Sequence, residues 1–440
     1  MSETLPATTL PASLPHSSGT LAAGEAEAFA ALLADARRAS LALAAAPTQV
    51  KNRALRGLSE GLRANIPEIV AANALDLAAG AENGLNAGLL DRLTLDAARI
   101  RSLADAVDEI EQLTDPVGQV VRGSSLPNGV KISQVRVPFG VVGVIYEARP
   151  NVTVDIAALA LKSGNAAVLR GGSSAENSNR VLVALIQRAL VGAGLPGECA
   201  QTIDPFGRAG ATALMQARGH VDVLIPRGSA GLIQAVVTES TVPVIETGAG
   251  VVHIFLDASA NEAWAADIVH NAKVQRPSVC NAVETVLVHE QAADRVLPGV
   301  LAKLAESGVT IHGDAAVRAL YPAAVPATEE DWATEYMSLD LAVAVVADLD
   351  AAIRHIRRYS TGHTESIITN DIVNAERFLN EVDSAAVMVN ASTRFTDGGE
   401  FGFGAEVGIS TQKLHARGPM GLPELTSTKW IVRGTGQIRS

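Results

Sequence analysis

The spacing of hydrophobic positions divides the chain into a helical first part and a longer part in which strands and helices alternate. In residues 23–110, apolar positions recur every three or four residues among good helix formers, which predicts several helices. From about residue 139 to 245, short apolar runs rich in β-branched residues alternate with helical patterns. Such alternation is typical of a parallel, doubly wound α/β sheet.

The elements of this first predicted sheet can be placed individually. We expect strands at 138–146, 165–169, 201–204, 221–226 and 242–246, and helices at 153–162 and 181–190 and from the turn at 227–231 to residue 237. The pattern begins again after Gly250, with strands at 252–257, 284–289, 341–346, 366–369 and 386–390 and a helix at 262–273. The chain therefore predicts a second α/β domain.

A third pattern lies outside both sheets. Residues 120–123 and 130–137 alternate between apolar and polar side chains, and Asn128-Gly129 between them is a strong hairpin signal. The C-terminal segment 426–434 is also strand-like. Together these segments predict a β-flap, whose exposed edge would pair with another subunit.

These patterns give four parts. We assign 1–21 to a disordered tail, 22–118 and 138–245 to a first α/β domain, 246–424 to a second α/β domain, and 119–137 and 425–440 to a flap. The tail is rich in Ser, Thr, Pro and Ala and lacks the basic and apolar blocks of a signal peptide.

Composition narrows the functional classes. The net charge of −12 and the 3% aromatic content argue against nucleic-acid binding, which needs cationic surfaces and stacking side chains. Two cysteines make no disulfide framework, so a cytoplasmic location is expected. No apolar run is suited to spanning a membrane. The nine histidines show no paired ligand spacing, so no metal site is predicted.

Cys280 is the first candidate for chemistry. It follows the predicted helix 262–273, and Lys273 and Arg276 lie close in sequence. Neighbouring positive charge lowers a thiol pKa and makes the thiolate a nucleophile. A buried structural cysteine is the commoner fate, and local sequence alone favours it. Cys199 has no comparable surroundings, and a structural role is expected for it.

Two glycine turns could bind phosphate groups. Gly171-Gly172-Ser173 and Gly228-Ser229 each follow a predicted strand and each open a helix. Backbone N–H groups at such a helix start favour anions such as a dinucleotide pyrophosphate, although ordinary turns use glycine too. Arg170 beside the first turn could meet a 2′-phosphate, which favours NADP over NAD.

A polar segment ends the first predicted strand. Asn151 there could donate its amide N–H to an oxyanion, or could cap the following helix. Arg149, Arg276 and Arg394 could each bind a carboxylate or phosphate with two hydrogen bonds. For any single arginine, a solvated surface role is the more common alternative.

Taken together, the segments resemble the aldehyde dehydrogenase superfamily. The resemblance is carried by Tyr146-Glu-Ala-Arg-Pro-Asn151, Leu169-Arg-Gly-Gly-Ser173, Ile225-Pro-Arg-Gly-Ser229, Gln275-Arg-Pro-Ser-Val-Cys280-Asn281, Tyr359-Ser-Thr-Gly-His-Thr-Glu365 and the stretch 401–422. It covers nearly the whole chain after the tail. It implies an α/β fold of two doubly wound parallel-sheet domains, a dinucleotide-binding domain at 22–118 and 138–245 and a catalytic cysteine domain at 246–424. The small β-flap at 119–137 and 425–440 would serve oligomerisation.

The resemblance also implies site residues. It makes Cys280 the nucleophile, overriding the local preference for a structural role, and Asn151 the oxyanion donor. It puts Arg170, Gly171 and Ser173 near the adenosine ribose, Gly228 and Ser229 near the pyrophosphate, and Glu335 near the nicotinamide ribose. The superfamily's Trp-Asn-Phe-Pro motif is absent here, so Arg149 competes with Asn151 for the oxyanion position.

Within the superfamily, the segments are most similar to members that act on an acyl phosphate. That similarity implies NADPH-dependent reduction of L-glutamyl 5-phosphate to L-glutamate 5-semialdehyde through a cysteine thioester, in proline biosynthesis. Arg149, Arg276 and Arg394 would bind substrate. The expected partners are other copies of the chain, as a dimer or tetramer, and a complex with the upstream glutamate kinase is an open question.

Two other functions remain at this stage. One is a hydrolytic, NAD(P)-dependent aldehyde dehydrogenase in which Glu246 activates water. The other is a catalytically silent scaffold on the same fold, against which Cys280 and the two glycine turns argue.

Overall fold

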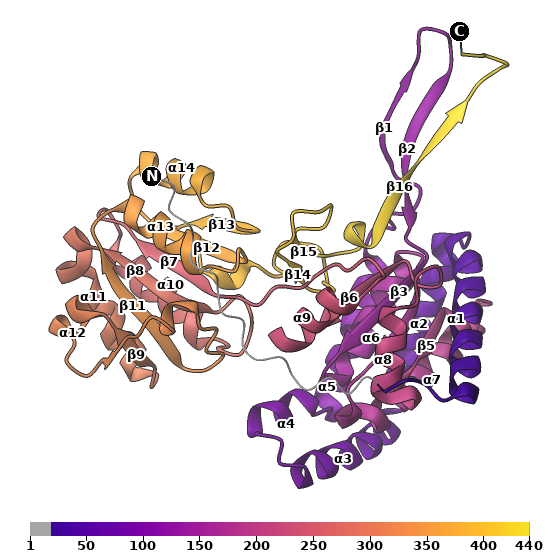
Figure 1. Cartoon of the computed structure of the whole chain (residues 1–440), viewed down its shortest axis with the longest axis horizontal. Coiled ribbons are helices and arrows are strands. Elements are labelled where there is room, and N and C mark those ends of the chain that lie inside the picture. Colours follow the sequence, from indigo (N-terminus) through magenta and orange to yellow (C-terminus); the bar gives the residue numbers. More distant parts are fainter. Residues whose placement is uncertain (1–18, 440) are drawn as a thin grey trace.

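The computed structural model describes residues 19–439 as two lobes joined by extended segments, with a narrow β-arm projecting from one of them (Figure 1). The predicted tail, residues 1–21, lies outside the described residues except for 19–21. Among the described residues, no helix combines the length and the apolar character that crossing a membrane requires.

From residue 19 onward, five helices precede the first strand, in line with the helical periodicity of 23–110. They are α1 (Ala23–Ala44), α2 (Thr48–Ala64), α3 (Ile66–Glu82), α4 (Ala87–Leu93) and α5 (Ala97–Gln112). The apolar stripe of α2 is buried against α5 and α7, and Leu55 and Leu62 there are fully enclosed. Burial of such a stripe, more than helix propensity, holds a surface helix in place.

The first lobe contains a four-stranded parallel sheet in the order β5-β4-β3-β6. Its strands are β3 (Val141–Tyr146), β4 (Ala166–Arg170), β5 (Ala200–Thr202) and β6 (Val223–Arg227). Its helices are α6 (Pro150–Lys162), α7 (Glu176–Gly192), α8 (Gly207–Met215) and α9 (Ala230–Glu239). The strand–helix alternation predicted for this region is confirmed.

Helices cover both faces of this sheet. Along β3, Val142 and Val144 pack into one apolar cluster with α2, α5, α6 and α7, whereas Val141 and Ile145 pack into a second cluster with α1 and α8. Successive side chains of a strand point to opposite faces, so each residue of β3 joins one core or the other. This is why the strand reads as a continuous apolar run.

Two details of the prediction were wrong. Residues 242–246 do not form a strand, because they make only a single bridge, between Leu224 and Val244, and Pro243 has no N–H to extend a ladder. The third strand also ends early, since Asp204 begins a short 3₁₀ turn (Asp204–Phe206) instead of continuing β5.

The second lobe contains a seven-stranded, wholly parallel sheet in the order β10-β9-β11-β8-β7-β12-β13. Its strands are β7 (Val252–Leu256), β8 (Val283–His289), β9 (Thr310–Gly313), β10 (Val325–Pro326), β11 (Asp340–Val346), β12 (Thr364–Ile368) and β13 (Ala386–Val389). Its helices are α10 (Glu262–Val274), α11 (Glu290–Glu306), α12 (Ala315–Leu320), α13 (Leu349–Tyr359) and α14 (Ile372–Glu381). The predicted second α/β unit is confirmed, and a short pair, β14 (Ile409–Ser410) and β15 (Gly418–Pro419), follows it.

The arm is the predicted β-flap. Strands β1 (Val120–Ser125), β2 (Lys131–Pro138) and β16 (Thr426–Arg433) form an antiparallel sheet with β2 in the centre (Figure 1). Gly129, with a φ of +86°, makes the turn that Asn128-Gly129 predicts. The outer strands β1 and β16 leave one edge each without a partner strand in the described chain.

A buried ion pair joins the two ends of the segment between α10 and β8. Lys273, in the last turn of α10, lies 2.5 Å from a carboxylate oxygen of Glu284 in β8, and neither side chain is exposed to solvent. Burial raises the pKa of Glu284 and lowers that of Lys273, so each group depends on the other to stay charged. The turn that contains Cys280 runs between these two anchors.

Removing one partner of this pair should destabilise the second lobe. Lys273→Met leaves the Glu284 carboxylate buried without its cation, so we expect a loss of about 3–5 kcal/mol in unfolding free energy, measured by urea denaturation. The double variant Lys273→Met/Glu284→Leu should recover most of that loss, because two apolar groups replace the pair. Lys413→Ala, which breaks an exposed pair with Asp383, is the control and should leave the midpoint nearly unchanged. A Lys273→Met protein as stable as wild type would contradict this account.

Candidate active site

The reactive region lies where the edges of the two sheets meet. Glu147, Arg170 and Arg227 stand at the carboxyl ends of β3, β4 and β6, where open α/β sheets bind ligands. Cys280 instead precedes β8, so it belongs to the amino-terminal edge of the second sheet. The site thus combines the carboxyl edge of one sheet with the amino edge of the other.

Cys280 sits in a half-buried turn held by close backbone packing. A side chain on Gly250, just before β7, would collide with the Cys280 carbonyl oxygen, so only glycine fits there. The Gly250 N–H donates to a Glu335 carboxylate oxygen at 2.8 Å. The structure therefore brings Glu335 to the loop that supports the cysteine, although the two are far apart in sequence.

The charges around Cys280 oppose one another. The pKa of Cys280 is raised to about 11, chiefly by burial and also by the carboxylates of Glu406 and Glu335. The guanidinium groups of Arg227 and Arg149 lower it and offset part of this rise. At neutral pH the thiol of the free protein is therefore mostly protonated. Cys199 is buried in the core of the first lobe and its pKa is raised to about 12, consistent with the structural role expected for it.

The three predicted substrate arginines gather around this turn. Arg149 is half-buried, and burial, followed by the charges of Arg227, Arg92 and Arg276, lowers its pKa to about 10. Arg394 donates from Nε to Gln275 Oε1 at 3.0 Å and from Nη1 to Asn281 Oδ1. These hydrogen bonds connect it to both ends of the turn. Arg276 lies exposed in the turn itself.

Asn151 is not the helix cap that one alternative proposed. Arg149 occupies the cap position, and Asn151 lies in the first turn of α6, where its amide donates to Asp155 Oδ2 at 3.0 Å. Burial raises the pKa of Asp155 to about 6. An Asn amide carries two N–H groups, so one remains for an oxyanion. The oxyanion role of Asn151 stays a prediction.

Protein carboxylates already contact both glycine turns. The Gly171 N–H donates to Asp204 Oδ1 at 2.7 Å, and the Ser229 N–H donates to Glu147 Oε2 at 3.0 Å. A side chain on Gly228 would come within 2.7 Å of that same Glu147 oxygen, so the Glu147 side chain would have to move to admit it. A pyrophosphate at Ser229 would therefore have to displace the Glu147 carboxylate, which is on an exposed side chain.

Arg170, at the carboxyl end of β4, has an N–H group that makes no hydrogen bond within the described residues. Its Nε is buried and lacks a hydrogen-bond partner among the described residues. Ser173 begins the short 3₁₀ turn (Ser173–Ala175) and is exposed. A buried donor left unpaired costs free energy, so this guanidinium suits an anionic ligand group.

Sequence reasoning missed three charged residues of the site. Arg227 and Glu406 act on the charge state of Cys280, and Arg92 donates to the Ser278 carbonyl in the cysteine turn at 3.0 Å. Arg227 lies between a predicted strand and a predicted phosphate turn, and that position was a usable signal. Nothing in the local sequence of Arg92 or Glu406 points to the site.

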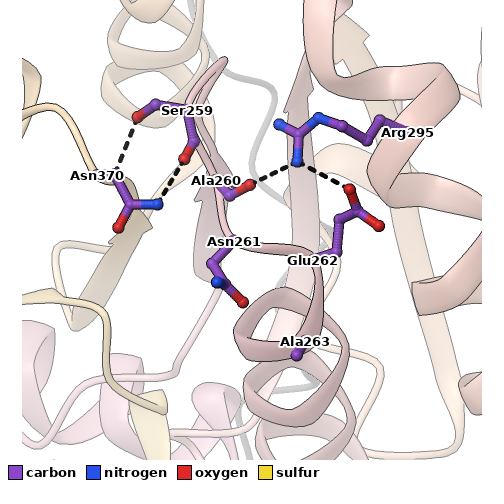
Figure 2. A pocket seen from close by; sticks show the side chains of 7 residues that line it. All are labelled: Ser259, Ala260, Asn261, Glu262, Ala263, Arg295 and Asn370. Carbon is purple, nitrogen blue, oxygen red and sulfur yellow. Dashed lines mark hydrogen bonds and ion pairs between the residues drawn. The ribbon is translucent and has the colours of Figure 1, made fainter.

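A separate hollow lies at the opposite edge of the second sheet. Its lining residues, beyond the carboxyl ends of β7 and β12, are Ser259, Ala260, Asn261, Glu262, Ala263, Arg295 and Asn370 (Figure 2). Arg295 donates to the Ala260 carbonyl at 2.8 Å and pairs with Glu262, and Asn370 bonds to Ser259 (Figure 2). The polar groups that line this hollow thus bond to one another. The hollow also lies at the opposite ends of the strands from Cys280.

Comparison with known proteins shows the family and the fold. A model described as the aldehyde dehydrogenase family matches residues 7–319. The chain belongs to the aldehyde dehydrogenase family. The resemblance found in its motifs and the α/β fold expected from it are thereby confirmed.

The similar proteins within this family share one name. A gamma-glutamyl phosphate reductase of Leifsonia xyli is 73% identical over 92% of this chain and 96% of its own length. The enzyme of the same name from Clavibacter michiganensis is 67% identical over 93% of this chain and 94% of its own. A crystal structure of gamma-glutamyl phosphate reductase from Thermotoga maritima, 46% identical, covers 94% of this chain and all of its own with a TM-score of 0.91.

The pKa of Cys280 predicts a steep alkylation profile. Since only the thiolate reacts, the rate of iodoacetamide modification of Cys280 in the free protein should rise about tenfold per pH unit from pH 7 to pH 10. Peptide mass spectrometry gives the rate at each cysteine, and buried Cys199 serves as the unreactive internal control. A rate that is already constant above pH 8 would show that the arginines outweigh burial.

Proposed function

We propose that this chain reduces L-glutamyl 5-phosphate to L-glutamate 5-semialdehyde and phosphate with NADPH, a step of proline biosynthesis. The observation that carries the proposal is a half-buried Cys280 surrounded by arginines, in a chain 73% identical to a gamma-glutamyl phosphate reductase. An acyl phosphate offers both an electrophilic carbon for the thiolate and a dianionic leaving group for the arginines.

The first chemical step belongs to Cys280. Its thiolate sulfur bonds to the acyl carbon, and the bond from that carbon to the phosphate oxygen breaks, which gives a thioester and free phosphate. Arg227 and Arg149 oppose the rise in the thiol pKa that burial causes. The carbonyl oxygen gains negative charge during attack, and we assign its stabilisation to the free amide N–H of Asn151 and to backbone N–H groups.

The arginines bind the charged parts of the substrate. Arg149, Arg276 and Arg394 lie around the cysteine turn, and the charges of Arg149 and Arg394 both interact with Cys280. Their guanidinium groups can neutralise the phosphate as the carbon–oxygen bond breaks. Stabilising the departing dianion in this way lowers the barrier to thioester formation.

The carboxyl edge of the first sheet would hold the cofactor. Arg170, Gly171 and Ser173 would meet the adenosine ribose and its 2′-phosphate, Gly228 and Ser229 the pyrophosphate, and Glu335 the nicotinamide ribose. The unpaired Arg170 Nε supports this placement and supports NADPH as the preferred cofactor. When bound, NADPH supplies the hydride that converts the thioester to the aldehyde.

Hydrolytic aldehyde oxidation is not favoured. The backbone N–H of Glu246 donates to Gln412, and its carboxylate lies 3.4 Å from the amide nitrogen of the same residue. The similar proteins named above are reductases of an acyl phosphate by name. A silent scaffold is equally unsupported, because the chain retains Cys280 in a charged, partly accessible turn.

The proposal extends to assembly and domain roles. The outer edges of β1 and β16, which have no partner strand within residues 19–439, offer a surface for a dimer or tetramer of the chain. We retain the division into a dinucleotide-binding domain at 22–118 and 138–245, a catalytic domain at 246–424, and a flap at 119–137 and 425–440. A cytoplasmic location and a complex with the upstream kinase belong to the same hypothesis.

The reverse reaction gives the most direct assay. Glutamate 5-semialdehyde should be oxidised only when inorganic phosphate is present, and faster with NADP than with NAD. Cys280→Ala should abolish turnover yet leave NADPH binding, measured by fluorescence titration, unchanged within about twofold. Cys199→Ala is the matched cysteine control and should stay active. Oxidation that proceeds without phosphate would refute the assignment.

Arg170 should determine cofactor preference. Arg170→Ala removes a cation from the expected 2′-phosphate position, so the KM for NADP should rise about tenfold or more while that for NAD changes little. Arg180→Ala, an exposed arginine on α7, controls for lost positive charge in the same lobe. Equal losses with the two cofactors would place Arg170 away from the 2′-phosphate.

A further inference from the structure

One guanidinium of the first lobe reaches into the reactive turn of the second. Arg92, in α4, donates from Nη2 to the carbonyl oxygen of Ser278 at 3.0 Å, although the two residues lie 186 positions apart. Ser278 precedes Cys280 by two residues in the same turn. Arg92 is itself half-buried.

The helix that carries Arg92 is firmly attached to the first lobe. Asn73, a buried residue of α3, donates to the Leu93 carbonyl at 2.8 Å and to Ser178 Oγ at 3.1 Å, and accepts from the Leu95 N–H at 2.7 Å. Leu93 is fully buried. The residues that flank Arg92 are thereby fixed to the start of α7, so its position relative to the first sheet is set.

Arg92 joins a group of cations whose nearest carboxylates act on them only from a distance. Asp91 interacts in this way with Arg92 and Arg276, and Glu406 with Arg227. Within residues 19–439, no carboxylate lies within ion-pair distance of Arg92, Arg149, Arg227 or Arg276. The charges of Arg92, Arg227 and Arg276 each weaken the protonation of Arg149. Like charges held together in a partly buried space cost free energy, and a bound anion would relieve that cost.

The substrate chemistry selects which anion belongs there. In an acyl phosphate, the phosphoryl group is attached through one oxygen to the carbon that the Cys280 sulfur attacks. Its oxygens must therefore lie within a few ångströms of the cysteine turn, whereas three carbons separate the α-carboxylate from the acyl carbon. The phosphoryl group also carries more negative charge than a carboxylate, which suits several guanidinium groups.

We propose that Arg92, together with Arg149 and Arg276, forms the site that binds the phosphoryl group of the acyl phosphate and holds the departing phosphate. This inference rests on the proposed function and adds to it a residue from the opposite lobe. Because Arg92 belongs to the first lobe and Arg276 to the second, a phosphate bound between them links the lobes at the reactive thiol.

Phosphate kinetics in the oxidative direction test the proposal. With glutamate 5-semialdehyde and NADP saturating, Arg92→Ala should raise the KM for inorganic phosphate about 10- to 100-fold, the loss expected for one charge-assisted contact. The KM for NADP should stay within about twofold of wild type. Arg92→Lys, which keeps the charge, should recover part of the phosphate affinity, and Arg101→Ala, an exposed arginine of α5, should behave as wild type.

A binding measurement that needs no turnover separates this proposal from the proposed function. Inorganic phosphate should slow iodoacetamide modification of Cys280 in the wild-type protein and should protect Arg92→Ala only at about 10-fold or higher concentration. Protection lost in Arg92→Ala supports the phosphate site even if wild type shows no phosphate-dependent oxidation. Equal phosphate KM and equal protection in wild type and in both Arg92 variants would overturn the role of Arg92, while phosphate-dependent activity would leave the proposed function standing.

Discussion

The buried ion pair between Lys273 and Glu284 is the constraint on which the reactive turn depends. It fixes the end of α10 to the start of β8, and the turn with Cys280 has to span the space between them. Glu284 also accepts from the Met337 N–H at 3.4 Å, and Met337 adopts a φ of +56° that non-glycine residues seldom adopt. The same pair therefore helps to place the neighbouring Glu335, whose carboxylate holds Gly250 against the back of Cys280.

In this turn, burial and the neighbouring arginine charges have opposite effects on the pKa of Cys280. Burial makes Cys280 a poor nucleophile, and with the neighbouring charges included the pKa of the thiol is raised to about 11. The guanidinium groups of Arg227 and Arg149 reduce this penalty, and the same groups would be repelled by one another without an anion. Under the proposed function, a substrate with a phosphoryl group would bring the anion that these guanidinium groups lack. Packing in the surrounding fold offsets the unfavourable free energy of holding these like charges together.

Much of the architecture could be predicted from periodicity, because each sheet is buried on both faces and its strands read as apolar runs. The errors have physical causes. Residues 242–246 look like a strand in composition, but Pro243 interrupts the ladder. Asn is a residue type that often caps helices, which led to the cap alternative for Asn151. The helix α6 instead begins at Pro150, whose fixed φ suits the first helical position.

The candidate site was predictable in part. Family motifs located Cys280 and the turn around it, because those residues are contiguous in sequence. The contribution of Arg92 could not be found in this way, because its contact with Ser278 depends on how two lobes pack across 186 positions of chain. The same holds for the carboxylates that contact the glycine turns, since Asp204 and Glu147 approach Gly171 and Ser229 only in the folded sheet.

The central claim is that Cys280 carries the acyl group as a thioester which phosphate then cleaves. A rapid-mixing experiment with glutamate 5-semialdehyde and NADP, first without phosphate, tests it most directly. The account predicts a burst of NADPH equal to one equivalent per active site, then a halt, and renewed turnover when phosphate is added. Absence of a burst, or steady NADPH formation without phosphate, would contradict it.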